Sequence, residues 1–402
     1  MRIASRSVVF GFGLLCAVMT TAAEPEANIR RLDGKNLSAG QIDAEVRKQM
    51  EQERVPGLAL ALIQEGRPVY VKSYGMRSVE EARPLEAETV MYGASLTKLA
   101  FAYMVMQLVD EKKLDLDKPI ATYLPKPLPE YPKYAELFAD ARWKAVTPRM
   151  LLNHTPGFPN YRFLNPDEKL DFKFDPGSRY AYSGEGYNLL QFVLEEGLGM
   201  DVGREMERRV FERFGMKRTS MTWRDDFEAN VAHGYTLDGR LEKHRARRNV
   251  RAAGSMDSTI TDCANFLAGF MRGEGISAEA RREMLRPQIA IASAHQFPTL
   301  DPATNPALEK IGLAAGLGLV LFKSSDGPAF FKGGHDDSTG NMAVCVESKK
   351  QCILLMSNSV RAEIIYPALV NSLFGETKLP WDWEYNPTVA APTLSPSPTS
   401  TR

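Results

Sequence analysis

The sequence predicts an α+β fold in which strands from both ends of the chain share one antiparallel sheet, flanked by helices, and the middle forms a mainly helical lobe. Residues 57–75 have the pattern of a β-hairpin, and strand patterns return only between 316 and 356. The stretch from about 94 to 285 is mostly helical in pattern. Because each layer must bury an apolar face, we expect the helical middle to pack against the sheet, with an active site between them.

Residues 1–23 have the pattern of an export signal. Two arginines precede an apolar run over 8–19, and small residues at 21–23 suit cleavage before Glu24. The run is shorter than the roughly 20 residues that a membrane-spanning helix needs. We therefore expect a periplasmic or secreted protein with no stable membrane span after signal cleavage.

Helix and strand patterns follow in order along the mature chain. A helical pattern over 41–54 leads into the N-terminal hairpin. The C-terminal strand patterns, and the helix that closes them, fall at 316–322, 329–332, 342–346, 352–356 and 364–374. The end of the chain is rich in Pro, Ser and Thr, so we expect a folded domain over 24–385 and a disordered tail over 386–402.

The composition excludes some classes of partner. Hydrophobic residues make up 44% and charged residues 25% of the chain, which is ordinary for a globular protein. Lys plus Arg and Asp plus Glu are equal at 50 each, so no overall positive field favours nucleic acid or an anionic membrane. We expect a small-molecule substrate and no nucleic acid.

Two cysteines fall in a predicted hairpin. Apolar runs flank the polar stretch 347–350, so Cys345 and Cys352 would face each other across two strands. An oxidising compartment would allow a disulfide, and two reduced thiols packed as small hydrophobes fit the pattern equally well. Neither reading makes these cysteines catalytic.

The most informative segment begins at Ser95. The residues that follow, 96–109, form a helix pattern that is apolar on nearly every face, so this helix must be buried. Ser95 lies in its first turn, where free backbone N–H groups and the helix dipole favour a developing negative charge. Lys98 follows on the same face, within reach of the serine hydroxyl. Partial desolvation would lower the pKa of this lysine and allow it to act as a base toward the hydroxyl.

Two further segments are candidates for the same site. Tyr182 lies in a Gly- and Tyr-rich loop at 176–188, and a phenol near a lysinium loses its proton more easily and could relay protons. Packing is the commoner role of a loop tyrosine. In segment 332–340, KGGHDDSTG, a strand end meets a loop, where backbone N–H groups could complete an oxyanion hole with that of Ser95. A polar turn between two strands fits this last pattern equally well.

Other catalytic classes lack their motifs. The five histidines show no zinc-ligand spacing and no cysteine pair is spaced as a zinc knuckle, so no metal or cofactor is implied. The segment around Ser95 lacks the last glycine of a Gly-x-Ser-x-Gly elbow, and no Gly-rich phosphate loop follows a strand. An α/β-hydrolase or a nucleotide-dependent enzyme is therefore disfavoured.

Three segments, taken in order, resemble the serine β-lactamase and penicillin-binding-protein-like family. They are the segment around Ser95, the segment around Tyr182 and the KGGHDDSTG segment. The likeness is greatest to its class C β-lactamase, D-alanyl-D-alanine carboxypeptidase and family VIII esterase branch, and it covers about residues 43–374. Other matching stretches are 55–59, 151–157 and 253–256. The resemblance implies a β-lactamase/transpeptidase-like fold with Ser95 as nucleophile, Lys98 as its partner and Tyr182 as the tyrosine of the Tyr-x-Asn motif.

Two positions depart from the family pattern. Gly184 replaces the asparagine of the Tyr-x-Asn motif, which in the family contacts a substrate amide. The Lys-Thr-Gly element is matched best by His335 and the two aspartates after it, ending at Asp337, which makes the Ser338 N–H the second oxyanion donor. The alternative register is 332–334. In the family this element holds a substrate carboxylate, which the aspartates would repel.

These features together predict an exported serine hydrolase that forms an acyl-enzyme on Ser95 and acts on esters or amides lacking that carboxylate. Lys98 and Tyr182 would serve as bases while water releases the acyl group. A D-alanyl-D-alanine carboxypeptidase or weak β-lactamase, acting on peptides or β-lactams, is the alternative with the same catalytic residues. A non-catalytic peptidoglycan- or ligand-binding relative is the other alternative, but it would be expected to have lost Ser95 or Lys98.

Overall fold

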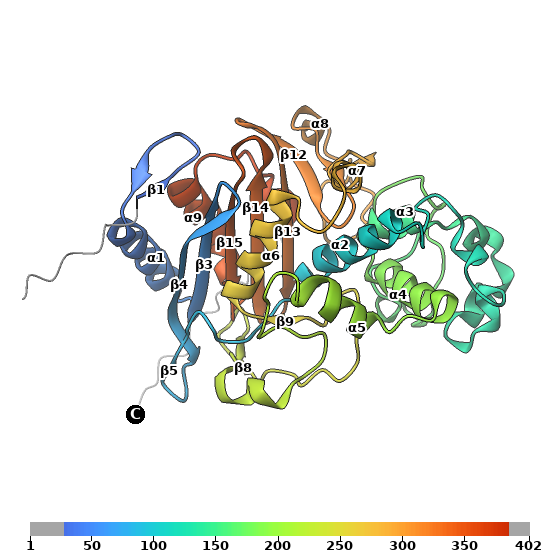
Figure 1. Ribbon diagram of the computed structural model, residues 1–402, viewed down its shortest axis with the longest axis horizontal. Helices are drawn as coiled ribbons and strands as arrows, with labels where there is room; N and C mark the ends of the chain where they lie inside the picture. Colours follow the sequence, from blue (N-terminus) through green and yellow to red (C-terminus); the bar gives the residue numbers. More distant parts are fainter. Residues whose placement is uncertain (1–27, 386–402) are drawn as a thin grey trace, which may run out of the picture.

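The structure, a computed structural model, describes residues 28–385. The predicted signal at 1–23 and the predicted tail at 386–402 lie outside the described residues. A nine-stranded antiparallel sheet forms the centre, in the order β10-β11-β12-β13-β14-β15-β3-β4-β5 (Figure 1). Strand β3, early in the chain, pairs with the late strand β15, and β4 follows on the other side of β3. Both ends of the chain therefore share one sheet, as predicted.

The elements have the following bounds. The strands of the large sheet are β3 (Gly57–Gln64), β4 (Arg67–Ser78), β5 (Arg83–Pro84), β10 (Ile289–Ala290), β11 (Ala314–Ala315), β12 (Val320–Ser324), β13 (Gly327–Asp336), β14 (Thr339–Val346) and β15 (Gln351–Ser357). Smaller pairs are β1 (Ile29–Arg30) with β2 (Asn36–Leu37), β6 (Met91–Tyr92) with β9 (Asp257–Ser258), and β7 (Gly234–Tyr235) with β8 (Leu241–Glu242). The helices are α1 (Ala39–Glu53), α2 (Leu96–Asp110), α3 (Pro148–Leu152), α4 (Gly184–Leu198), α5 (Val202–Met206), α6 (Ile260–Arg272), α7 (Ala278–Met284), α8 (Ala307–Lys310), α9 (Ala362–Leu369) and α10 (Trp381–Glu384).

Strand β3 shows why the sheet is covered on both faces. Successive residues of a strand point to opposite faces. One face of β3 carries Ala59, Ala61 and Ile63 and the other carries Leu58, Leu60 and Leu62, all of them buried. Helices α1 and α9 cover the leucine face, and α6 covers the alanine face (Figure 1). An apolar run without polar alternation is the expected sequence of such a strand.

A group of helices forms a lobe beside the sheet. In Figure 1, α3, α4 and α5 lie to the right of the strands, and α2 connects the sheet to this group. Helix α2 is buried along nearly its whole length, as its all-round apolar pattern predicts. Helix α6, although it lies within the predicted helical range, packs on the sheet instead.

Two C-terminal strands differ most from the sequence prediction in their bounds. Strand β12 begins at Val320 because residues 316–319 form a turn, in which Gly318 has φ +87° and the Gly316 N–H donates to the Leu319 carbonyl. Strand β13 continues beyond the predicted end at 332 as far as Asp336. This extension places the strand end beside Ser95.

Strands β14 and β15 decide between the two readings of the cysteine pair. Cys345 and Cys352 are directly opposite in the register and form a disulfide, with Cα atoms 4.1 Å apart. The remaining described cysteine, Cys263, is a buried free thiol. None of the helices within residues 28–385 is long and apolar enough to cross a membrane.

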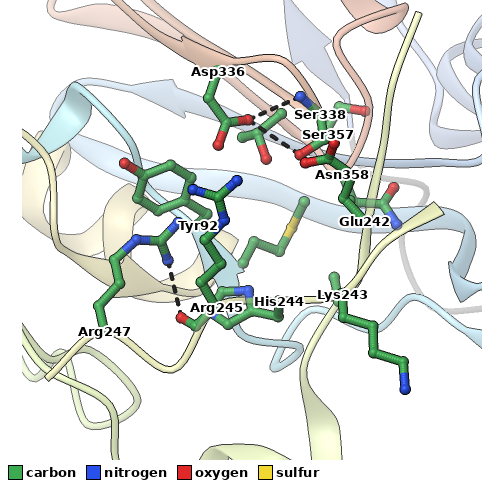
Figure 2. Close-up of a pocket in the computed structure, with 14 residues that line it drawn as sticks. Tyr92, Glu242, Lys243, His244, Arg245, Arg247, Asp336, Ser338, Ser357 and Asn358 are labelled. Carbon is green, nitrogen blue, oxygen red and sulfur yellow. Dashed lines mark hydrogen bonds between the residues drawn. The ribbon is translucent and has the colours of Figure 1, made fainter. Parts of the chain in front are cut away.

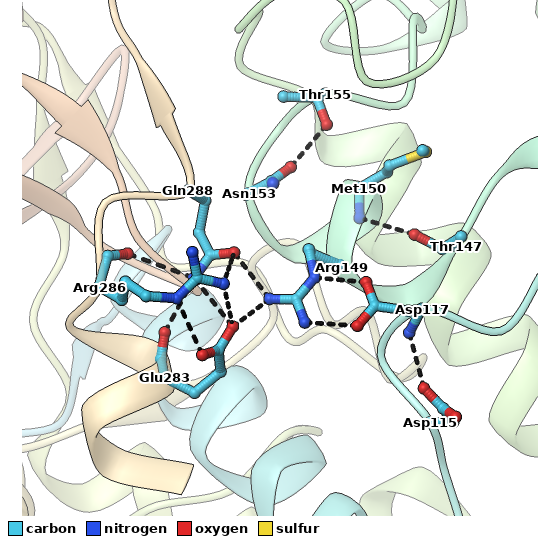
Figure 3. A network of polar contacts seen from close by, with 10 residues as sticks. All are labelled: Asp115, Asp117, Thr147, Arg149, Met150, Asn153, Thr155, Glu283, Arg286 and Gln288. Carbon is cyan, nitrogen blue, oxygen red and sulfur yellow. Dashed lines mark hydrogen bonds and ion pairs between the residues drawn. The ribbon is translucent and has the colours of Figure 1, made fainter. Parts of the chain in front are cut away.

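A polar network joins the lobe to the sheet-side elements (Figure 3). Arg149 on α3 makes two hydrogen bonds to Asp117, of 2.6 and 2.7 Å, and also donates to Glu283 on α7. Gln288, just before β10, accepts from Arg149 at 2.7 Å. Arg286 completes the network by donating to Glu283. One arginine thus links three segments that are far apart in the sequence.

Candidate active site

Ser95 lies at the N-terminus of α2, directly after the short strand β6. The turn into the helix needs Ala94 at φ +45°, and the Thr97 hydroxyl donates to the Ala94 carbonyl at 2.6 Å. The same hydroxyl accepts from the Met256 N–H at 3.2 Å, which ties this turn to the segment before β9. The serine is therefore held at the positive end of a buried helix, as predicted.

Lys98 is the immediate partner of Ser95. Its Nζ lies 3.0 Å from Ser95 Oγ and donates to the Ala253 carbonyl at 2.5 Å. The side chain is completely buried. Burial, and secondarily the charge of Lys332, lowers the pKa of Lys98 well below its usual range. A neutral amine beside the hydroxyl is the form that can accept the serine proton.

Tyr182 completes this group of side chains. Its hydroxyl is hydrogen-bonded to the Ser95 side chain and accepts from Lys332 Nζ at 3.4 Å. Its ring stacks on His154, with centroids 4.3 Å apart. Burial raises the pKa of Tyr182 well above its usual range. This direction is opposite to the expectation that a nearby lysine would ease loss of the phenol proton, because burial disfavours the phenolate.

His154 is a positioning residue that the sequence prediction missed. It is buried, and its Nδ1 accepts from the Ser183 N–H at 3.1 Å. Burial lowers the pKa of His154 well below its usual range, and the charge of Lys98 acts in the same direction. A neutral imidazole fixed in this way provides a flat surface for the Tyr182 ring.

The end of β13 forms the opposite wall of the pocket. Lys332, Gly333, Gly334 and His335 line it together with Ser95. Strand β12 pairs with β13 only as far as Phe331, so the edge beyond that point has no strand on this side. A Cβ atom at Gly334 would lie 3.0 Å from the Ser95 nitrogen, so the two backbones are in close contact.

This placement corrects the predicted register of the third motif. Ser338 lies in the turn after β13, and its N–H donates to Asp336 Oδ1 at 2.9 Å, so it is not available to a substrate oxyanion. Ser338 and Asp336 line a different pocket, with Tyr92 and Arg245 (Figure 2). Asp337 is exposed in the same turn. The prediction failed because nothing in the sequence showed that β13 extends past 332, which turns these residues away from Ser95.

The register that matches the structure is Lys332-Gly333-Gly334, which the sequence left as the alternative. His335 lies in the pocket, as predicted. In this register, however, it is the residue that follows the motif and not the first residue of it. Its Nδ1 lies 3.0 Å from Glu363 Oε1. Burial disfavours the imidazolium, but the charge and hydrogen bond of Glu363 prevail and raise the pKa of His335 to about 9.

Gly184 lies at the first position of α4, beneath Tyr161. Its N–H donates to Asn160 Oδ1 at 3.0 Å. A Cβ atom at position 184 would lie 2.5 Å from the Tyr161 ring, so this ring takes the space of a longer side chain. Asn160 and Tyr161 line the pocket wall in its place.

Glu384 and Gln296 are further pocket residues that the sequence prediction missed. Both are buried, and Gln296 Nε2 donates to Glu384 Oε2. Burial raises the pKa of Glu384, and the charge of Lys332 partly opposes that rise. Neither residue belongs to a motif. Glu384 lies in the short helix α10 and Gln296 in an irregular segment, both far from Ser95 in the chain, so no sequence signal identifies them.

Comparison with known proteins agrees with this geometry. A family model described as Beta-lactamase matches residues 42–364. Esterase EstB from Burkholderia gladioli is 26% identical over 223 residues, 49% of this chain and 55% of that protein. Penicillin-binding protein 4* from Bacillus subtilis (strain 168) is 27% identical over 271 residues, 59% of this chain and 57% of that protein.

The chain thus spans about half the length of the curated relatives it matches. Among solved structures, the octameric penicillin-binding protein homologue from Pyrococcus abyssi has a TM-score of 0.67 and 24% identity, covering 84% of this chain and 78% of that chain. This likeness confirms the predicted fold. Because the family model also matches most of the sequence, the chain belongs to the Beta-lactamase family.

Proposed function

We propose that this protein is a serine hydrolase that works through an acyl-enzyme on Ser95 and acts on esters or amides. The observation that carries the proposal is the pair formed by Ser95 and a completely buried Lys98, with Nζ and Oγ 3.0 Å apart. Burying a charged lysine that has no carboxylate partner costs free energy, so a lysine buried in this way should be neutral. A neutral lysine can act as a base.

The proposed reaction begins with attack of Ser95 Oγ on the substrate carbonyl carbon. Lys98 Nζ accepts the hydroxyl proton, and the carbonyl oxygen becomes an oxyanion bound by the N–H groups of Ser95 and His335. As the bond to the leaving group breaks, the Tyr182 phenol donates a proton to it and is reprotonated from Lys98. Water then attacks the acyl carbon and gives its proton to Lys98, and Lys98 returns that proton to Ser95 Oγ as the acid departs.

The first test is intact mass of the protein after brief exposure to an activated acetate ester, with Ser95→Ala as control. We expect either a mass increase of one acetyl group or rapid release of the leaving group of the ester. The Ser95→Ala variant should show neither. The variant should unfold at the wild-type temperature. Turnover by Ser95→Ala near the wild-type rate would overturn the proposal.

A second candidate function is that of a cell-wall peptidase or weak β-lactamase. The position of Lys332 beside Ser95 favours it, because the corresponding lysine in the resembling family holds a substrate carboxylate. Benzylpenicillin in the same mass experiment separates the two functions. A stable penicilloyl adduct that depends on Ser95 would favour the peptidase.

We also propose that the protein is exported to the periplasm or secreted. The apolar run at 8–19 and the small residues at 21–23 support this, as does the disulfide between Cys345 and Cys352. The expected mature N-terminus is Glu24, which N-terminal sequencing of the protein from its natural host would identify. An intact N-terminus in the cytoplasmic fraction would contradict export.

A further inference from the structure

The short helix α10 brings a carboxylate into the pocket from near the end of the described chain. Glu384 is 3% exposed and lines the pocket with Ser95, Lys332 and His335. The neighbouring Trp383 is also buried and anchors the helix. An acidic side chain buried beside a proposed nucleophile has no role in the reaction described above, so its function needs a separate explanation.

The place that Glu384 occupies is defined by Gly333. A Cβ atom at Gly333 would lie 1.9 Å from Glu384 Oε1, so the carboxylate fills the space that a side chain at 333 would take. In the corrected register, Lys332 and Gly333 correspond to the lysine and threonine that hold a substrate carboxylate in the resembling family. Here the threonine hydroxyl is absent, and a carboxylate of the protein itself lies in its place.

Contacts around Glu384 hold it in this position. Gln296 Nε2 donates to Glu384 Oε2, and the Gln296 N–H donates to the Trp383 carbonyl at 2.8 Å. The buried Tyr180 hydroxyl donates to Gln296 Oε1 at 3.2 Å. Because Tyr180 fixes the oxygen end of the amide, the nitrogen end must face Glu384. The carboxylate therefore belongs to an ordered, buried network.

The charges that face this part of the pocket are Lys332, the His335–Glu363 pair and Glu384. Lys332 Nζ donates to the Gly333 carbonyl at 2.7 Å and to the Tyr182 hydroxyl at 3.4 Å. It also interacts electrostatically with Glu384. A second carboxylate brought in by a substrate would compete with Glu384 for the charge of Lys332 and would be repelled by Glu384.

We propose that the Glu384 carboxylate occupies the place of a substrate carboxylate beside Lys332 and so selects substrates whose leaving group is neutral. This inference rests on the proposed function, because it assigns the substrate class of the same site. It also explains how a pocket that keeps Lys332 would discriminate against carboxylate-bearing substrates. From the sequence alone, this discrimination is attributed to Asp336 and Asp337.

The test uses two esters that differ only in charge, meta-acetoxybenzoate and meta-acetoxybenzamide. Both release the same acetyl group, and the carboxylate or its neutral amide lies on the leaving phenol. The measured quantity is the ratio of kcat/KM for the benzoate to kcat/KM for the benzamide. Above about pH 7, the value to which burial raises the pKa of Glu384, we expect Glu384→Gln to raise this ratio by about tenfold or more, because it removes the opposing charge and keeps the shape.

The matched control is Asp337→Asn, which removes an exposed acidic charge outside the pocket and should leave the ratio within about twofold of wild type. Glu384→Ala serves as a second variant should Glu384→Gln not fold, and it should shift the ratio in the same direction. A folded Glu384 variant with an unchanged ratio would overturn the inference, and a shift in Asp337→Asn equal to that in Glu384→Gln would do the same.

Binding of the product meta-hydroxybenzoate, measured by calorimetry, gives a readout that does not require turnover. We expect Glu384→Gln to bind it about tenfold more tightly than wild type does. If wild type hydrolyses neither ester but Glu384→Gln gains this affinity, the proposed function fails, and what stands is that Glu384 occupies the place of a ligand carboxylate. If wild type hydrolyses the benzamide and neither the ratio nor the affinity changes in Glu384→Gln, the inference alone fails.

Discussion

The proposed base, Lys98, shares its buried pocket with a second lysine. Burial lowers the pKa of Lys98, and the charge of Lys332 lowers the same pKa further. The free amine is the form that accepts the Ser95 proton. Activity should therefore be present above the lowered pKa of Lys98 and should decrease as the pH falls through it.

The first prediction concerns Lys332→Met. Removing this cation takes away one cause of the shift, so the pKa of Lys98 should rise and the acid limb of the kcat/KM profile should move to higher pH. The measurement is the pH profile for a neutral ester such as meta-acetoxybenzamide. Lys323→Met, an exposed change on β12, should leave the limb in place. A limb that stays fixed in Lys332→Met would show that a group other than Lys98 is the base.

The second prediction concerns the pair formed by His335 and Glu363. Burial acts against the imidazolium, but Glu363 raises the pKa of His335 to about 9, above the usual 6.5. A raised pKa in the folded state contributes stability that is fully present below the unfolded pKa and is lost as the pH rises through about 9. Glu363→Gln should therefore lower the free energy of unfolding by about 1 kcal/mol near pH 6, and by little near pH 10.

Urea unfolding of wild type and Glu363→Gln at these two pH values measures the difference. A destabilisation that is the same at both would mean that Glu363 acts through packing and not through the charge of His335. The side chain of Glu363 is 14% and that of His335 30% exposed, so solvent should weaken the interaction and the expected difference is small.

At the level of elements, the contact between β13 and α2 positions the proposed oxyanion donors. The edge of β13 beyond Phe331 faces the first turn of α2, and Gly334 allows the two backbones to approach. A Cβ atom at 334 would also lie 2.9 Å from the Leu96 nitrogen. A side chain here would push the strand away from the helix and separate the N–H groups of Ser95 and His335.

The third prediction is therefore that Gly334→Ala lowers kcat by about 10²- to 10³-fold, the usual cost of losing one oxyanion donor. The stability loss should be modest, about 1–3 kcal/mol, because the strand can shift at its open edge. Steady-state kinetics and thermal unfolding of the same sample measure both. Gly40→Ala, at an exposed position in α1 with ample space, is the control. Wild-type kcat in Gly334→Ala would exclude the proposed oxyanion hole.

At the scale of the whole molecule, the Arg149 network connects the helical lobe to the segments around the sheet (Figure 3). Glu283 is its central acceptor. The hydrogen bond from Arg286 is the main cause that lowers the pKa of Glu283 to about 2, and Arg149 and Gln288 add to it. A lowered pKa in the folded state contributes stability above the usual value of 4.5, which is lost as the pH falls toward about 2.

The fourth prediction is that Glu283→Gln lowers the melting temperature at neutral pH and that the difference from wild type shrinks below about pH 4. Glu279→Gln, an exposed change on the same helix, should have little effect at any pH. Thermal unfolding followed by circular dichroism at several pH values measures both variants. A pH-independent loss in Glu283→Gln would show that the network stabilises through shape alone.

Much of this fold could be predicted because its signals are local. The hairpin formed by β3 and β4, the all-apolar helix α2 and the pairing of Cys345 with Cys352 each follow from patterns within a few tens of residues. The predicted bounds of β12 and β13 were less accurate. They depend on a turn at Gly318 and on which strands pair with each edge, and the local sequence does not show either. Ser95 and Lys98 lie on one helical turn, so their proximity was also a local property.

What the sequence by itself determined is the set of chemical groups within single elements: the serine and lysine on α2, and the tyrosine before α4. Only the tertiary structure decided what surrounds them. It selected Lys332-Gly333-Gly334 over His335 to Asp337, raised the pKa of Tyr182 through burial, and brought Glu384 into the pocket. The physical reason is that register, burial and through-space charge depend on segments distant in the chain, and local patterns carry no information about those distances.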